Sequence, residues 1–279
     1  MKIIFFGSSK FVIPIIEVLH KNFDLILVLT TEENLTDAVP AYCLKNKIQY
    51  LSLQQFNNSV IQQLQKLKCP VAVLADFGLI IPTEILSLFP KGIINIHPSL
   101  LPKYRGPTPV QTAILNGEKT TGVSIIRLDE KIDHGPILAQ EKEKILNTDT
   151  SETLYKRLFK KGSNLLPKVI DSYLKDSLKL TTQRHKDATF TKPLTRHDGF
   201  IDLSSFKFKI ENLKLKIRAY YPWPGVWTEI KIKDKGLRIK FLPENKIQVE
   251  GKKPVNYKDF LNGYPEVKQQ LGKLLEQLV

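Results

Sequence analysis

Short apolar runs alternate with stretches of helical periodicity through the first half of the chain. Residues 3–6 and 25–29 are short apolar runs, which are typical of buried parallel strands. Between them, apolar residues recur at helical spacing: Phe11, Val12, Ile15, Ile16 and Leu19. The strand, helix and strand together predict one βαβ unit.

The alternation continues further along the chain. The pattern predicts helices over 54–67, with Ser52 as a candidate cap, and near 109–115, and strands over 71–75, 92–96, 122–128 and 137–140. We therefore expect an α/β fold, a Rossmann-like open and mostly parallel sheet with helices on both faces. Ligands of such sheets bind outside the carboxyl ends of the strands, so the turns after Ala75, Ile96 and Leu128 are where chemistry is expected.

The second half predicts a separate, smaller domain. A long amphipathic helix that Thr150 or Ser151 would cap closes the first domain, 1–176. Periodicity then fades into a polar, turn-rich linker, 177–205. Beyond it, in a domain 206–279, we expect a helix within 206–221, two strands within 227–241 around a turn at 233–236, and a final helix over 265–278.

Charge is concentrated in that second half. The 279 residues carry a net charge of +14, with 8 basic against 7 acidic residues over 1–100 but 20 against 11 over 181–279. Aromatic residues are interspersed with the basic ones, a combination typical of nucleic-acid binding. A solvated, lysine-rich face would have the same composition, so charge leaves both interpretations open.

Several classes of protein are disfavoured. No helical apolar run approaches the roughly 20 residues of a membrane span, and the apolar stretch 3–7 is too short for a signal peptide. Cys43 and Cys69 lack metal-ligand spacing and are expected to be small buried hydrophobes. The histidines His20, His185 and His197 have no partners suggestive of a metal site. A cytoplasmic protein without metal or membrane partner is the expectation.

Candidate chemistry lies in two of the expected turns. Asn95 and His97 are two apart at the end of an apolar run, so the period of a strand puts both side chains on one face. Asp133 lies in the turn after another apolar run, 122–128, and can join Asn95 and His97 only through the fold. An amide that donates to an oxyanion, an imidazole that manages a proton and a carboxylate that orients the imidazole suit acyl transfer to an amine.

The residues around this triple resemble a known family. Segment 94–106, with Asn-x-His followed by Ser-Leu-Leu-Pro, and segment 128–136, with Leu-Asp-x-x-x-Asp-x-Gly, are similar to the active-site segments of the 10-formyltetrahydrofolate-dependent formyltransferases. Segments 5–8, 76–82 and 218–227 resemble the methionyl-tRNA formyltransferases among them.

The resemblance implies a reaction and its partners. It implies formyl transfer from 10-formyltetrahydrofolate, as co-substrate and without metal, to the methionine α-amine of initiator methionyl-tRNA, by a monomeric enzyme of translation initiation. Asn95, His97 and Asp133 would be catalytic, while Asp129 would shape the loop. The expected folate contacts are Ser99, Leu100, Leu101, Pro102, Phe77, Gly78 and Leu79. Arg218 and Lys192 are the expected tRNA contacts.

Two departures from the family leave alternatives open. Segment 30–37 is short and acidic where many methionyl-tRNA formyltransferases carry a longer basic loop. Between Trp227 and Gly251 there is room for about three short strands, so the C-terminal domain is expected to be an abbreviated OB-like one. A sugar-nucleotide N-formyltransferase, which shares the catalytic triple, is the alternative enzyme. A non-catalytic RNA-binding protein on the same scaffold is the third possibility.

Overall fold

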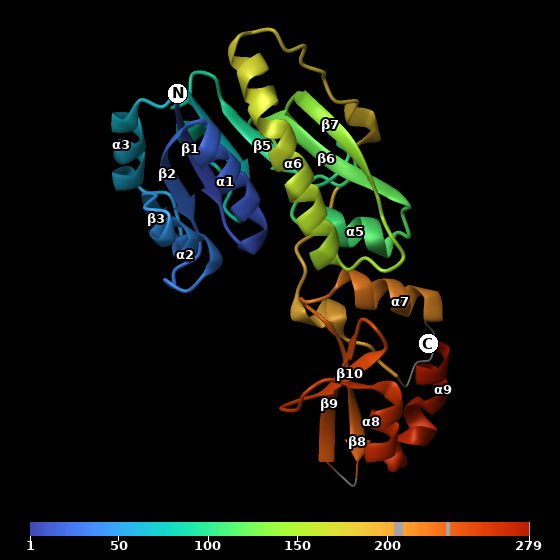
Figure 1. The fold of residues 1–279 in the computed structure, drawn as a ribbon. Coiled ribbons are helices and arrows are strands. Elements are labelled where there is room, and N and C mark those ends of the chain that lie inside the picture. Colours follow the sequence, from blue (N-terminus) through green and yellow to red (C-terminus); the bar gives the residue numbers. More distant parts are fainter. Residues whose placement is uncertain (204–208, 233–234, 279) are drawn as a thin grey trace. The chain divides into compact units, whose positions relative to one another are not determined.

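The chain folds into two compact units. The computed structural model describes residues 1–203, 209–232 and 235–278 (Figure 1). The first unit contains residues 1–109, 120–144 and 155–191, and the second contains residues 110–119, 145–154 and 192–279. The second unit therefore also takes in two segments that lie within 1–176 and part of the segment expected to be a linker.

A mostly parallel sheet forms the centre of the first unit, as the alternating pattern predicts. Its strand order is β3-β2-β1-β4-β5-β6-β7. The first five strands pair in parallel, and β6 and β7 join antiparallel at one edge. The strands are β1 (Lys2–Gly7), β2 (Asp24–Thr30), β3 (Tyr50–Ser52), β4 (Val71–Ala75), β5 (Ile93–His97), β6 (Thr120–Arg127) and β7 (Ile137–Lys144).

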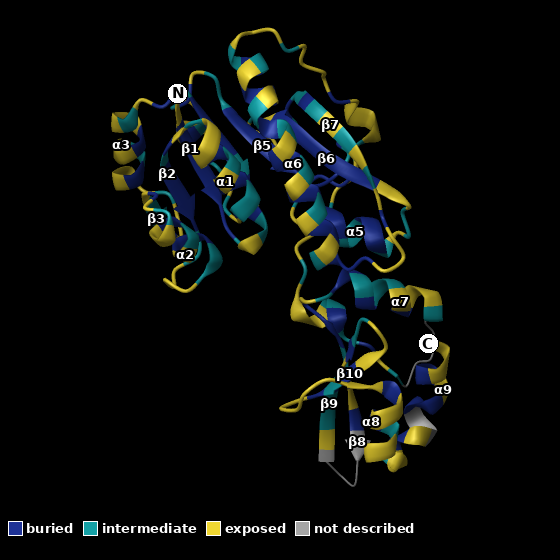
Figure 2. Cartoon of the chain, in the orientation of Figure 1, coloured by how far each residue is buried: buried dark blue, intermediate teal, exposed yellow. Residues whose placement is uncertain are grey.

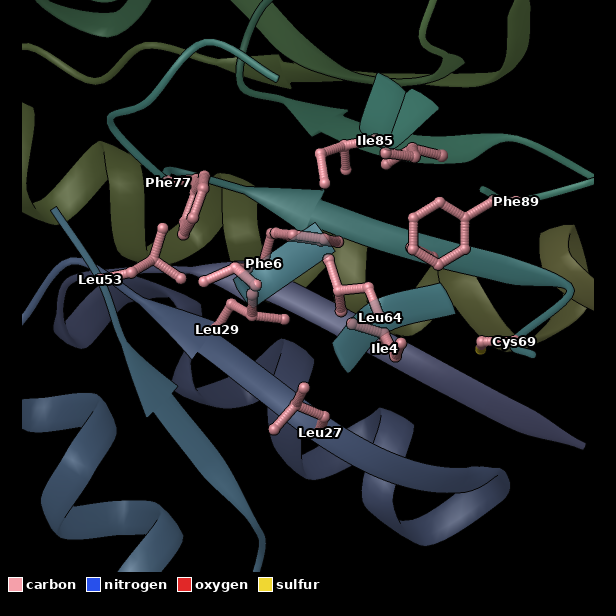
Figure 3. Close-up of a cluster of buried hydrophobic side chains, with 13 residues drawn as sticks. Ile4, Phe6, Leu27, Leu29, Leu53, Leu64, Cys69, Phe77, Ile85 and Phe89 are labelled. Atoms are coloured by element: carbon pink, nitrogen blue, oxygen red, sulfur yellow. The ribbon is translucent and has the colours of Figure 1, made fainter. Parts of the chain in front are cut away.

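Helices cover both faces of this sheet. On one face, side chains of β1 and β2 pack with Leu64 of α3 (Asn58–Leu67) and Ile85 of α4 (Thr83–Leu86), as Figure 3 shows. On the other face, Phe11 stacks on Tyr155 of α6 (Ser151–Leu174), with ring centroids 5.4 Å apart. The helices α1 (Ile13–Asn22) and α2 (Ala38–Lys45) complete the described part of this unit, together with 3₁₀ turns at Lys10–Val12 and His185–Asp187.

Burial follows the predicted apolar runs. Every residue of β5 is buried, as are all residues of β1 after Lys2, whereas the helices alternate between buried and exposed faces (Figure 2). Cys43 and Cys69 are buried free thiols, which confirms the prediction of small buried hydrophobes. Burial raises the pKa of the Cys43 thiol to about 11, so it stays protonated at neutral pH.

Some element boundaries differ from the sequence pattern. The helix expected from residue 54 begins at Asn58, and its cap is Asn57, whose side chain accepts a hydrogen bond of 3.0 Å from the Val60 N–H. The Ser52 cap was wrong, because this serine ends strand β3. The pattern did not separate α2 and β3 from their surroundings. The predicted Thr150 cap of α6 is confirmed by its hydroxyl, which accepts from the Thr153 N–H at 3.3 Å.

The second unit is built on an antiparallel sheet. Its strands are β8 (Val226–Ile232), β9 (Lys235–Leu242), β10 (Lys246–Val249) and β11 (Val255–Asn256), in the order β11-β10-β9-β8. The described helices are α5 (Pro109–Leu115), α7 (Ile210–Ala219), α8 (Tyr257–Gly263) and α9 (Lys268–Leu278), with 3₁₀ turns at Arg196–Gly199 and Pro265–Val267.

The predicted hairpin is present in this unit, because β8 and β9 pair antiparallel from Val226 with Phe241 to Ile232 with Lys235. Two parts of the prediction, residues 233–234 of the turn and 206–208 of the expected helix, lie outside the described residues. In the part of the chain that the structure describes, no helix combines the length and the apolar character of a membrane span.

Candidate active site

Strand β5 places two polar side chains at the carboxyl end of the parallel strands. Asn95 and His97 share one face of the strand with Ile93, because alternate residues of a strand point the same way. Strand β5 lies between β4 and β6, where Asn95 pairs with Leu74 and Ile126. Both side chains are consequently buried, each at 5% exposure.

The loop after β6 brings a carboxylate to the same place. Asp133 has a positive φ of 47°, in the left-handed region, two residues before Gly135. A Cβ on Gly135 would lie 1.8 Å from the carbonyl oxygen of Arg127, so only glycine lets the loop return this close to its own strand. The Asp129 carboxylate accepts a bond of 3.0 Å from the Lys131 N–H, which fits its expected loop-shaping part.

The three predicted catalytic side chains converge. The amide Nδ2 of Asn95 donates to Oδ1 of Asp133 at 3.1 Å. The other carboxylate oxygen, Oδ2, lies 3.5 Å from Nδ1 of His97. Residues almost 40 positions apart in sequence thus form one cluster of amide, imidazole and carboxylate.

Backbone groups that follow β5 complete this cluster. The ring nitrogen Nε2 of His97 lies 2.9 Å from the carbonyl oxygen of Tyr104. A carbonyl can only accept, so Nε2 carries a proton and Nδ1 is the nitrogen that faces the carboxylate. The Gly106 N–H donates to Oδ2 of Asp133 at 2.8 Å. These two backbone bonds hold His97 and Asp133 in place. Neither bond uses Nδ1 of His97, the ring nitrogen that can accept a proton.

A second layer of charged and polar groups surrounds Asp133. Arg105 is buried, and burial lowers the pKa of its guanidinium although Asp133 and Asp129 act in the opposite direction. Its Nη2 lies 2.9 Å from Nδ1 of His185. An arginine can only donate, so this imidazole nitrogen accepts and the ring is neutral. Partial loss of hydration, with His134 and Arg105 nearby, lowers the pKa of His185.

His134 belongs to the same layer. Its Nδ1 lies 2.6 Å from Oδ2 of Asp129, and its ring stacks on His185 with centroids 3.9 Å apart. This stacking has no local signal in the sequence, because the loop and the segment around residue 185 come together only in the folded unit. In the described residues, no group of three or more His, Cys, Asp or Glu side chains is arranged to hold a metal ion.

Among the predicted folate contacts Ser99, Leu100, Leu101 and Pro102, two residues use polar groups in hydrogen bonds within the protein. The Ser99 hydroxyl is fully buried and donates to the carbonyl of Lys103 at 2.7 Å. The Leu101 N–H donates to the Ser124 hydroxyl at 3.0 Å. Leu100 and Pro102 are half-buried, so they are the members of the segment with surface to offer to a ligand.

The other predicted folate loop follows β4. The Phe77 ring is core, 2% exposed and edge-on to Phe6 at 5.4 Å, and its carbonyl accepts from the Ser8 hydroxyl at 3.3 Å. Gly78 is exposed with a φ of +84°, and Leu79 is half-buried. A ligand could thus meet the backbone at Gly78 and Leu79 but not the Phe77 side chain.

An open pocket lies beside the Asp133 loop. Its volume is about 550 Å³, within the range of small-molecule sites. One side is formed by the α4 region and the other by the loop after β6; the lining residues are Thr83, Leu86, Ser87, Leu128, Asp129, Glu130, Lys131 and His134. Periodicity did not single out the α4 residues, because a helix of four residues is too short to show a period.

The two predicted tRNA contacts differ in their surroundings. Arg218 donates to the backbone carbonyls of Asp149 at 2.7 Å and of Leu146 at 2.8 Å, and burial lowers its pKa. Its guanidinium therefore acts as an internal brace of the second unit. Lys192 is exposed.

Four residues at the site had no role assigned from the sequence. Tyr104, Arg105 and Gly106 directly follow the Ser-Leu-Leu-Pro segment, so proximity along the chain could have indicated them. Gln183 contacts the backbone of the Asp133 loop, with Nε2 2.8 Å from the Asp133 carbonyl oxygen. It lies in the segment expected to be a linker, and no local signal marked it.

Comparison with known proteins places the chain in a family. The family model described as formyl transferase matches residues 1–170. The methionyl-tRNA formyltransferase of Roseiflexus sp. (strain RS-1) is 36% identical over 239 residues, 82% of this chain and 73% of that protein. The one from Carboxydothermus hydrogenoformans is 31% identical over 274 residues, 95% of this chain and 87% of that protein. The chain belongs to the methionyl-tRNA formyltransferases.

Solved structures share the fold of this formyltransferase. A sugar N-formyltransferase from a Shewanella species has a TM-score of 0.69 at 19% identity and covers 88% of this chain and 98% of its own. A phosphoribosylglycinamide formyltransferase from Bacillus halodurans has a TM-score of 0.56 at 27% identity, over 63% of this chain and 97% of its own. The first of these likenesses concerns the fold alone.

Proposed function

We propose that this enzyme transfers the formyl group of 10-formyltetrahydrofolate to the methionine α-amine of initiator methionyl-tRNA. The observation that carries the proposal is the convergence of Asn95, His97 and Asp133 at the carboxyl end of β5. Family membership supports the reaction class, because relatives at 31–38% identity are methionyl-tRNA formyltransferases.

The three side chains would divide the chemistry as follows. The neutral amine attacks the formyl carbon, and the carbonyl oxygen becomes an oxyanion. Asn95 uses one amide N–H on Asp133, and its second would donate to that oxyanion. The amine's proton passes to the edge between His97 Nδ1 and Asp133, and the bond from the formyl carbon to N10 breaks as N10 takes up a proton.

Folate would enter from the side of the Asp133 loop. Asp129 and His134 are among the residues that line the open pocket, and Asp133 lies between those two residues in sequence. We propose that this pocket holds the folate ring system, with Gly78, Leu79, Leu100 and Pro102 as further contacts. A donor placed there would present its N10 formyl group to the carboxylate cluster.

The acceptor would be held by basic residues of the second unit, exposed Lys192 among them. Residues 206–240 hold ten basic and three acidic side chains. Phosphate contacts from such a segment supply affinity without reading sequence. Because Arg218 is used internally, its part in tRNA binding would be indirect, through the loop whose carbonyls it binds.

One assay tests the proposal. The purified protein is incubated with 10-formyltetrahydrofolate and either methionyl-tRNA or amino-sugar nucleotides, and the products are analysed for the N-formyl group. We expect formyl-methionyl-tRNA and no formylated sugar nucleotide. Formylation of the sugar alone would establish the alternative enzyme, and no formylation of either acceptor would contradict the proposal.

A further inference from the structure

Gln183 joins two segments of the active site through one buried side chain. It is 4% exposed. Its Oε1 accepts from Arg105 Nη2 at 2.7 Å and from Arg105 Nε at 3.2 Å. Its Nε2 donates to the carbonyl of Asp133 at 2.8 Å and to the carbonyl of Gly135 at 2.7 Å. All four bonds lie within the first unit, and both ends of the amide are used.

The orientation of this amide is fixed by its partners. Arg105 has only donors, so the atom that faces it must be the amide oxygen. The two backbone carbonyls have only acceptors, so the atom that faces them must be the nitrogen. No other neutral side chain of this length offers one acceptor and two donors in a plane, which explains why a glutamine fits here.

The bonds of Gln183 hold the backbone that directly follows the side chain of Asp133. Asp133 has a left-handed φ of 47°, which costs a non-glycine residue free energy unless its surroundings hold it. The two carbonyls that Gln183 binds are that of Asp133 itself and that of Gly135, two residues further along the turn. Arg105, on the other side of the amide, precedes Gly106, whose N–H donates to the Asp133 carboxylate. Gln183 thus connects the carboxylate's loop with the segment that binds the carboxylate.

We propose that Gln183, clamped by Arg105, is a positioning residue for Asp133: it sets the turn that aims the carboxylate at Asn95 and His97. The proposal rests on the proposed function, because the effect of Gln183 on Asp133 is measured through the rate of formyl transfer. Gln183 touches neither substrate in this scheme. Its loss therefore lowers kcat and leaves the KM for each substrate near its wild-type value.

Two variants separate this role from a simple bond to Arg105. Gln183→Glu keeps an acceptor for the guanidinium but cannot donate to the two carbonyls while ionised. Gln183→Met removes all four bonds at similar length. We expect both to lower kcat by roughly 10- to 100-fold, the cost of a small misplacement of a catalytic group. If only the bond to Arg105 mattered, Gln183→Glu would keep the wild-type kcat. That result would overturn the proposal.

A matched control comes from the same unit. Tyr173 is also buried, and its hydroxyl donates to the carbonyl of Lys91 at 2.8 Å. Tyr173→Phe removes one buried bond from side chain to backbone without touching the Asp133 loop. We expect this variant to keep wild-type kcat at a comparable loss of thermal stability. Equal losses of kcat in Tyr173→Phe and Gln183→Met would show that general destabilisation accounts for the effect.

A double-mutant cycle tests whether Gln183 acts through Asp133. In an Asp133→Ala background, Gln183→Met should cause little further loss of single-turnover rate, because residues that act as one unit are strongly non-additive. Losses that multiply would overturn the proposal. Wild-type formylation of methionyl-tRNA in the same assay reports on the proposed function, so its failure is distinguished from a failure confined to the Gln183 variants.

Discussion

At the scale of single residues, the Asp133 carboxylate is the centre of the site. One oxygen faces Asn95 and the other faces both His97 and Gly106. A carboxylate that accepts from an amide and a backbone N–H has a fixed direction, so it can orient the imidazole without moving. In the proposed reaction, the site would combine a donor for the oxyanion with a proton acceptor of defined geometry.

Removal of the converging side chains should abolish turnover while the fold is kept. We expect Asn95→Ala to lower kcat by roughly 10²- to 10³-fold, as for the loss of an oxyanion donor. His97→Ala and Asp133→Ala should each cost about 10²- to 10⁴-fold. Steady-state formylation of methionyl-tRNA measures the rates, and circular dichroism checks the fold. A folded His97→Ala or Asp133→Ala enzyme with near-normal kcat would contradict the assigned roles.

His185 should make the stability of the first unit depend on pH. Its pKa is lowered in the folded state, so between the folded and unfolded pKa values the unfolded chain binds more protons. The stabilising contribution is therefore present above the unfolded value of about 6.5 and is lost as the pH falls through the folded pKa. Protonation also ends the bond that His185 accepts from Arg105.

Urea unfolding between pH 7.5 and 5 measures this effect, with His185→Phe as the comparison. The aromatic ring keeps a surface for His134 to stack on but cannot take up a proton. We expect the free energy of unfolding to fall less with acid in the variant than in the wild type. Neighbouring His134, Asp129 and Lys131 are present in both proteins, so the difference belongs to His185. Identical pH slopes would rule out its contribution.

At the scale of elements, the loop after β6 depends on one glycine. An alanine at position 135 would place its Cβ 1.8 Å from the Arg127 carbonyl oxygen. Relief of this clash requires the backbone of the loop or of the strand to move. We expect Gly135→Ala to displace the Asp133 turn, to lower kcat by at least 10²-fold and to reduce the free energy of unfolding by about 1–3 kcal/mol.

Gly263→Ala is the control for that substitution, because apart from the neighbouring backbone of its own helix no atom lies within 4 Å of the added Cβ. Thermal melting and formylation rates of both variants can be compared directly. Near-wild-type activity of Gly135→Ala would show that the turn does not need the observed backbone. A loss in Gly263→Ala of similar size would show that the assay reports stability alone.

The elements themselves were largely predictable because their signal is local. Apolar runs of β1, β2, β4 and β5 and the periods of α1 and α6 are written in consecutive residues. Helix α2 was missed because most of its residues are apolar and Pro40 lies within it, so no polar face marks a helical period. The antiparallel direction of β6 and β7 is a property of pairing, which apolar runs do not record.

At the scale of the whole molecule, the uneven charge leads to a prediction about salt. Neutralising phosphates releases condensed counterions, so affinity for nucleic acid falls as a power of the salt concentration. Raising the salt from about 50 to 200 mM should therefore increase the KM for methionyl-tRNA by a factor of at least about 10. The KM for the folate donor should change much less, because that ligand releases few counterions.

Both KM values can be measured in one series of formylation assays. A parallel change of both with salt would contradict phosphate-dominated binding of the acceptor. Lys192→Ala should reduce the salt dependence of the methionyl-tRNA KM slightly. Arg218→Ala should instead lower the melting temperature, since its guanidinium binds two backbone carbonyls of the second unit.

The chain's sequence by itself determined the sheet-forming runs, the pairing of Asn95 with His97 on one strand face and the family to which these segments point. These are short-range facts, fixed by side-chain period and by residue type. Only the tertiary structure decided that Asp133 reaches them, that Arg218 is an internal brace and that Gln183, in an expected linker, holds the catalytic turn. Such contacts join residues 36 to 72 positions apart, and spacing along a chain carries no record of which distant groups a side chain will meet.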